Sequence, residues 1–176
     1  MNELIHRRGM IKSAYSVVFN QLVLFGDLQQ ISTTGTEWSG FTYSTGVDGI
    51  FKDKYYSQML AKGKPNSEFI FTAGNNTVGQ FTNLSLDTFI RIGGIFTCVY
   101  EDFNSVGLWD IAPGGSGESM TGKDAVCFNV TQMFGAGNEP TSVAEFKTWL
   151  AENNLDGYQP YNEGEIRYTT KPSWIQ

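Results

Sequence analysis

Histidine is almost absent from this sequence of 176 residues, in which His6 is the only one. A Ser/His/Asp triad or an imidazole-bound metal would have to use that residue near the start of the chain, where a rigid site is hard to build. The two cysteines, Cys98 and Cys127, lack the spacing of a zinc site. We expect two buried thiols, and a disulfide between neighbouring strands stays open as the alternative.

Positive charge is also scarce. Lys and Arg number 12 against 18 Asp and Glu, which gives a net charge of -6 and a pI near 4.7. Nucleic-acid binding through phosphates requires a basic surface, so we expect no nucleic-acid partner. No run reaches the roughly 18 apolar residues of a membrane span, and the start of the chain lacks the apolar stretch of a secretion signal. We therefore expect no membrane insertion and synthesis in the cytoplasm.

Glycine and aromatic residues, in contrast, are abundant: the sequence has 20 Gly, 13 Phe, 8 Tyr and 4 Trp. Short apolar runs alternate with polar and glycine-rich turns, which is typical of antiparallel strands with one face in a core. The pattern predicts an all-β protein built as a two-sheet antiparallel β-sandwich. Strands are expected at residues 21–25, 38–43, 50–62, 68–73, 77–83, 89–100, 106–111 and 125–130.

One short helix near the C-terminus interrupts this pattern. Ser142 and Glu145 have the spacing of a capping box, and Phe146 and Trp149 follow at helical intervals. We expect the helix to end near residue 153 or 154 and to pack on the sandwich as a lid.

The first 19 residues contain few turn-forming residues and are interpreted as an attachment arm. Leu4, Ile5 and Ile11 lie beside Arg7 and Arg8, a combination that favours docking on a partner or on a neighbouring subunit. A disordered leader is the alternative. The expected domain division is an arm at residues 1–19, a sandwich at 20–166 and a tail at 167–176.

Three stretches resemble a known kind of domain. Residues 128–141 read Phe-Asn-Val-Thr-Gln-Met-Phe-Gly-Ala-Gly-Asn-Glu-Pro-Thr, and residues 158–166 read Tyr-Gln-Pro-Tyr-Asn-Glu-Gly-Glu-Ile. Together with Asn-Gln-Leu-Val at 20–23, which is followed by Gly26-Asp27 and then by Trp38, they resemble the jelly-roll modules of bacteriophage tail and minor structural proteins. The resemblance implies a jelly roll similar to carbohydrate-binding modules.

Two functions follow from that resemblance as expectations. The first is a virion structural protein, located in the tail, a fibre or the head decoration, that contacts other virion proteins through the arm and forms a homotrimer or another cyclic oligomer. The second is a glycan-binding module that recognises bacterial surface polysaccharide without an assembly role. The virion is the expected location in both cases.

Sugar binding requires exposed aromatic faces flanked by hydrogen-bonding groups. Trp109, next to Asp110 and ahead of a glycine-rich loop, is the preferred candidate for a ligand contact, although most aromatics of a β domain are core residues. Tyr43, Tyr100 and Asn104 complete the predicted ligand-binding set.

We expect at most one structural metal ion and no catalytic site. The resemblance implies a structural calcium with Asp27 and Asp124 as candidate ligands, and ordinary turn acidity is the alternative. No other cofactor is expected. Glycoside hydrolysis needs two carboxylates at a set separation, and no spacing in the sequence selects such a pair. We therefore expect a protein that is not an enzyme.

Overall fold

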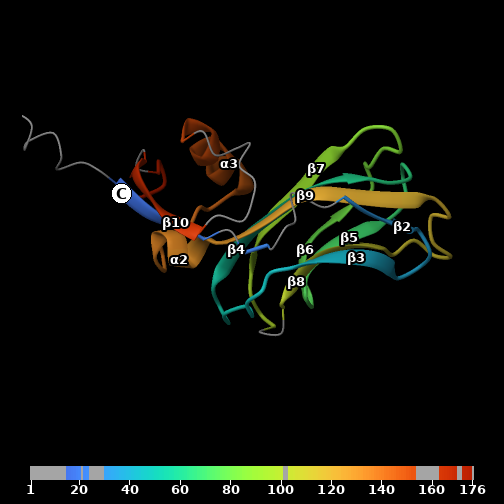
Figure 1. Ribbon diagram of the computed structural model, residues 1–176, viewed down its shortest axis with the longest axis horizontal. Helices are drawn as coiled ribbons and strands as arrows, with labels where there is room; N and C mark the ends of the chain where they lie inside the picture. The colour runs from blue at the N-terminus through green and yellow to red at the C-terminus, as the bar shows by residue number, and fades with distance from the viewer. Residues whose placement is uncertain are drawn as a thin grey trace, which may run out of the picture.

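The computed structural model describes residues 15–20, 22–23, 30–100, 103–153, 163–169 and 172–175. Two four-stranded antiparallel sheets lie face to face in it (Figure 1). The first sheet has the order β2-β9-β4-β7, with bounds Ile31–Thr34, Ser119–Asn129, Lys54–Lys62 and Ile90–Thr97. The second sheet has the order β3-β8-β5-β6, with bounds Ser39–Ser44, Ser105–Asp110, Phe69–Ala73 and Asn76–Phe81.

The strand pairing is that of a jelly roll. β5 pairs with β6, β4 with β7, β3 with β8 and β2 with β9, all antiparallel, so the pairs are nested along the chain. Successive nested pairs lie alternately in the second and the first sheet. A ribbon of four paired segments has therefore wrapped into two sheets. This confirms the all-β, two-sheet antiparallel β-sandwich that the sequence predicts.

Alternation along the strands decides which side chains enter the core between the sheets. In β5, Phe69, Phe71 and Ala73 are buried, whereas Ile70 and Thr72 lie on the other face and are half-buried. Cys98 and Cys127 also lie in this core and form no disulfide with each other. Burial raises the pKa of the Cys127 thiol to about 12.

A second apolar cluster covers one end of the outer face of the first sheet. The helices α2 (Val130–Phe134) and α3 (Val143–Glu152) lie beside that end of the sheet (Figure 1). Their apolar side chains form one cluster with Tyr56 and Phe128. β4 is therefore buried on both faces over most of its length. The predicted helix is confirmed: the Ser142 side chain accepts a hydrogen bond from the Glu145 N–H at 3.2 Å, and Asn153 ends the helix.

A strand near the start of the chain pairs with a strand near its end. β1 (Tyr15–Asn20) runs antiparallel to β10 (Glu163–Thr169), and farther on Trp174 packs against Phe134 and Trp149. The expected boundaries at residues 19 and 166 each fall inside a paired strand, and the domain division itself stays a prediction. The predicted arm residues Leu4, Ile5, Arg7, Arg8 and Ile11 lie outside the described residues. In the described part of the chain, neither helix has the length and apolarity to cross a membrane.

Candidate functional site

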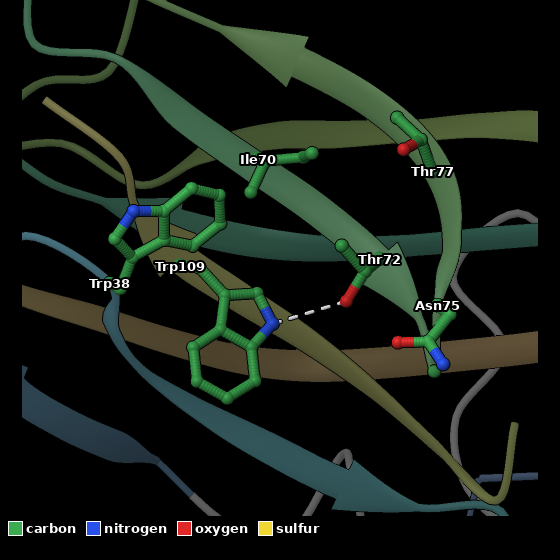
Figure 2. Close-up of a pocket in the computed structure, with 7 residues that line it drawn as sticks. Trp38, Ile70, Thr72, Asn75, Thr77 and Trp109 are labelled. Carbon is green, nitrogen blue, oxygen red and sulfur yellow. Dashed lines mark hydrogen bonds between the residues drawn. The ribbon is translucent and has the colours of Figure 1, made fainter.

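A shallow depression of about 350 Å³ lies on the outer face of the second sheet (Figure 2). This face is turned away from the core, because the buried residues of β5 and β8 point into the sandwich. The depression combines two indole rings with small hydroxyl and amide side chains. Its lining consists of Trp38, Ile70, Thr72, Gly74, Asn75, Thr77 and Trp109.

Trp109 forms the floor of the depression because two glycines allow its ring to lie close to the sheet. It is directly opposite Gly40 of β3, and a Cβ on Gly40 would stand 2.6 Å from the indole Cε3. A Cβ on Gly107 would stand 3.2 Å from the indole Nε1. Nε1 donates a hydrogen bond to Thr72 Oγ1 at 3.1 Å, which fixes the rotation of the ring (Figure 2). The indole is half-buried and lines the depression with the surface that remains exposed.

Trp38 stands at the edge of the same depression and is 67% exposed. Its φ of 58° lies in the left-handed region, which costs a residue with a Cβ about 1–2 kcal/mol. The conformation is held by the Trp38 N–H, which donates to the Asp110 carbonyl at 2.6 Å, and by Ser39 Oγ, which donates to the Thr34 carbonyl at 2.8 Å. An exposed aromatic residue held in a strained conformation is a feature that points to a functional surface.

Asp110 organises the loop beside Trp38 from a fully buried position. Its carboxylate accepts hydrogen bonds from the Ser116 N–H at 2.8 Å and the Ala112 N–H at 3.0 Å. Farther along this loop, the Gly117 N–H donates to the Gly35 carbonyl at 2.7 Å. The expectation that Asp110 contacts a ligand is therefore corrected: the carboxylate is occupied by the loop backbone and has no surface to offer.

A tight turn between β5 and β6 forms the polar end of the depression. Asn75 and Thr77 line it, while the Asn76 side chain faces inward and is buried. Asn76 Oδ1 accepts from the Val99 N–H at 2.8 Å, and its Nδ2 donates to the Tyr100 carbonyl at 2.9 Å. The turn is thereby fixed to the β7–β8 loop, which holds Asn75 in place.

The other predicted ligand residues lie away from this depression. Tyr43 is only 2% exposed, and its hydroxyl donates to the Gly122 carbonyl at 2.6 Å. Burial raises the pKa of this hydroxyl above its usual value. Tyr43 is thus a core residue and cannot stack on a ligand, contrary to expectation. Tyr100 and Asn104 are both exposed, but they belong to the β7–β8 loop and do not line the depression.

The predicted ligand-binding set does not contain Trp38, Ile70 or Thr72. The alternation of Phe69, Ile70, Phe71 and Thr72 does contain a signal, because it places Ile70 and Thr72 together on the face opposite the core. The left-handed backbone that exposes Trp38 has no comparable signal in the sequence.

The calcium expectation stays a prediction. In the part of the chain that the structure describes, no group of three or more His, Cys, Asp or Glu side chains could hold a metal ion. Asp27 lies outside the described residues. Asp124 has a φ of 54° beside the bulge between β4 and β9, a position at which Asp is tolerated better than most residues.

Comparison with known proteins gives similar solved structures only. No protein family and no curated protein sequence matches this chain. The C-terminal family 6 carbohydrate-binding module of a marine laminarinase from Zobellia galactanivorans is 12% identical, with 68% of this chain and 94% of that one covered and a TM-score of 0.39. A family 22 xylan-binding domain from Paenibacillus barcinonensis is 16% identical, with 66% and 82% covered and a TM-score of 0.41. A family 29 carbohydrate-binding module is 14% identical, with 66% and 89% covered and a TM-score of 0.34.

Proposed function

We propose that this protein is a non-enzymatic glycan-binding module whose ligand lies on the outer face of the second sheet. The observation that carries the proposal is the pair of indoles at one depression: Trp109 is set close to the sheet over Gly40, and Trp38 is exposed at the edge by a strained backbone. A pyranose presents an apolar C–H face that stacks on such a ring, while its hydroxyls need amide and hydroxyl partners.

The lining of the depression favours a neutral sugar. None of its seven residues is charged, and its polar groups are those of Thr72, Asn75 and Thr77. Its volume of about 350 Å³ is at the lower end of the range for ligand sites.

The proposal is tested by measuring binding of the protein to a panel of neutral polysaccharides by affinity electrophoresis and calorimetry. Trp109→Ala should reduce the affinity at least about tenfold, because stacked aromatic residues supply most of the contact area. Phe51→Ala is the matched control, since Phe51 is a 47% exposed aromatic outside the depression. Equal losses in the two variants, or no binding by the wild type across the panel, would refute the proposal.

A second proposal concerns where the module works. We propose that it is carried on a bacteriophage particle as a tail, fibre or head-decoration component, and that its partners are other virion proteins and bacterial surface glycan. The support is the resemblance of residues 128–141. Within that stretch Glu139 accepts a hydrogen bond from Thr131 Oγ1 at 2.8 Å and from the Gly137 N–H at 2.9 Å, and it pairs with Lys54 at 3.7 Å.

These contacts indicate that the resembling stretch is a structural unit that joins α2 to β4. Burial acts to raise the pKa of Glu139, but its hydrogen bonds and the Lys54 charge outweigh burial and lower the pKa.

An antiserum against residues 30–153 should label phage particles, from the strain that makes this protein, in electron micrographs. Labelling of the cytoplasm alone would contradict a place in the virion.

A further inference from the structure

A cluster of basic side chains lies on the outer face of the first sheet, on the other side of the sandwich from the depression. The Ala61 side chain lies in the core, and a Cβ on Gly122 would face the core residues Phe41 and Met59. Because successive residues of a strand face opposite sides, the neighbours Lys62 and Lys123 lie on the outer face. The two ammonium groups are 4.8 Å and 4.6 Å from the centroid of the Phe89 ring. They are therefore no farther apart than the sum of these distances, about 9.4 Å.

Among the residues that the structure describes, neither lysine has a carboxylate partner. Over the described ranges the only ion pair joins Lys54 and Glu139. Two like charges within about one Debye length of each other, roughly 10 Å at moderate salt, repel each other. The Phe89 ring offsets part of this repulsion through its π face, but it does not neutralise either charge.

Two more cations extend this cluster toward α3. Arg91 of β7 is next to Ile92, which enters the core, so Arg91 lies on the outer face. Lys147 belongs to α3, which packs on this same outer face. Partial burial and then the charge of Arg91 lower the pKa of Lys147. Four of the 12 basic residues of a chain with a net charge of -6 thus gather on one face.

We propose that this basic surface, formed by Lys62, Lys123, Arg91 and Lys147 around Phe89, binds an acidic polysaccharide through its uronate carboxylates. Charge complementarity selects an anionic ligand, and the half-buried Phe89 and Leu60 provide apolar contact for sugar rings between the charges.

Carboxylate fits this surface better than phosphate does. Phosphate sites are typically built from backbone N–H groups at loops and helix N-termini, or from arginine forks. Here Lys62 and Lys123 lie on strands whose backbone is committed to sheet ladders. A lysine ammonium is a compact point charge, which suits single carboxylates spaced along a polymer.

The test is binding of the full-length protein to polygalacturonate by affinity electrophoresis, at low and at high salt. The double variant Lys62→Gln/Lys123→Gln should lose about tenfold in affinity, and wild-type binding should weaken as salt rises. The control Lys52→Gln/Lys64→Gln removes the same charge elsewhere and should change affinity by less than about twofold. Melting curves of both double variants verify that they fold.

Three results would overturn the proposal: no retardation of the wild type by polygalacturonate, equal losses in the two double variants, or stronger retention by polyphosphate than by polygalacturonate. The outcome is separable from that of the neutral-glycan site. Trp109→Ala should leave binding to polygalacturonate intact, and Lys62→Gln/Lys123→Gln should leave binding to neutral glycan intact, because the residues lie on different sheets.

Discussion

Trp109 occupies the space above Gly40, its direct partner in the β3–β8 ladder, so the aromatic floor of the depression depends on a residue without a side chain. The same Cβ that would meet the indole would also stand 2.4 Å from the Leu108 carbonyl oxygen. The position is therefore restricted both by the neighbouring strand and by the ring above it.

Gly40→Ala should destabilise the protein by about 1–3 kcal/mol, since the added methyl group overpacks the strand pair. It should also shift Trp109 away from the sheet and weaken glycan binding. Urea unfolding and calorimetry measure the two effects. In Gly79→Ala, the three atoms nearest to the new Cβ all belong to the Phe81 ring, which can move, so this control should cost less than about 1 kcal/mol. A larger loss in the control would contradict the prediction.

Trp38→Gly should separate binding from stability. Glycine adopts a positive φ without strain, but it loses more backbone entropy on folding, so stability should stay constant or rise by up to about 1 kcal/mol. Glycan affinity should fall, because an exposed indole of the depression is lost. Lys52→Gly is the matched control, since Lys52 is exposed and has a φ of 69°. It should show the same change in stability with no change in affinity.

Trp149→Ala tests the second apolar cluster. Trp149 is 1% exposed and packs against Phe134, Phe146 and Trp174, so its loss leaves a large cavity between α3 and the first sheet. We expect a loss of about 3–5 kcal/mol in the free energy of unfolding, measured with urea. A loss below about 1 kcal/mol would show that the helices contribute little to the stability of the sandwich.

Stability should decline on the alkaline side. Burial raises the pKa of Cys127 and of Tyr55 to about 12 each, whereas unfolded cysteine and tyrosine ionise near about 8.5 and 10. Because the unfolded chain loses these protons first, the stabilisation present below about pH 8.5 is lost progressively up to about pH 12. Thermal unfolding from neutral pH upward measures the effect, and Cys127→Ala should reduce it. A midpoint that stays constant to about pH 11 would contradict this assignment.

Local patterns in the sequence were sufficient to predict most of the sandwich. The alternation at residues 69–73 gave β5 with its correct core face, and the capping box at Ser142 gave α3. β2 was missed because Ile31–Thr34 contains a single apolar residue and no buried one. β9 was predicted to begin at residue 125, but it begins at Ser119, because its first half is polar and is interrupted by the bulge near Asp124.

The candidate site was predicted only in part, because composition gives aromatic residues but not the faces they occupy. Trp109 is a predicted ligand residue and lies in the depression, whereas Tyr43 is also a predicted ligand residue but is buried. The difference depends on the strand register: Tyr43 lies opposite Val106, and both side chains enter the core. Trp38 is exposed because its own backbone is left-handed, which local sequence patterns do not predict. The pairing of β1 with β10 joins segments that are more than a hundred residues apart in the chain.

The pairing of β1 with β10 shows where the predicted arm can be removed without loss of a described strand. Since β1 begins at Tyr15, a chain that starts at residue 15 removes Leu4, Ile5, Arg7, Arg8 and Ile11 and retains every strand that the structure describes. A chain that starts at residue 21 also removes β1 and exposes the ladder edge of β10. We expect the first truncation to melt at the same temperature as the full chain and the second to melt several degrees lower, as a loss of about 1 kcal/mol predicts.

Assembly is then measured apart from folding, by light scattering on the full chain and on the chain that starts at residue 15. If the first 14 residues hold a homotrimer or another cyclic oligomer together, the truncated protein should be monomeric with an unchanged melting temperature, because only intersubunit contacts have been removed. An oligomer that survives both truncations would place the subunit interface on the sandwich itself. An oligomer that survives removal of residues 1–14 but is lost in the chain that starts at residue 21 would place the interface at the β1–β10 pair, whose outer edges can accept a strand from a second copy.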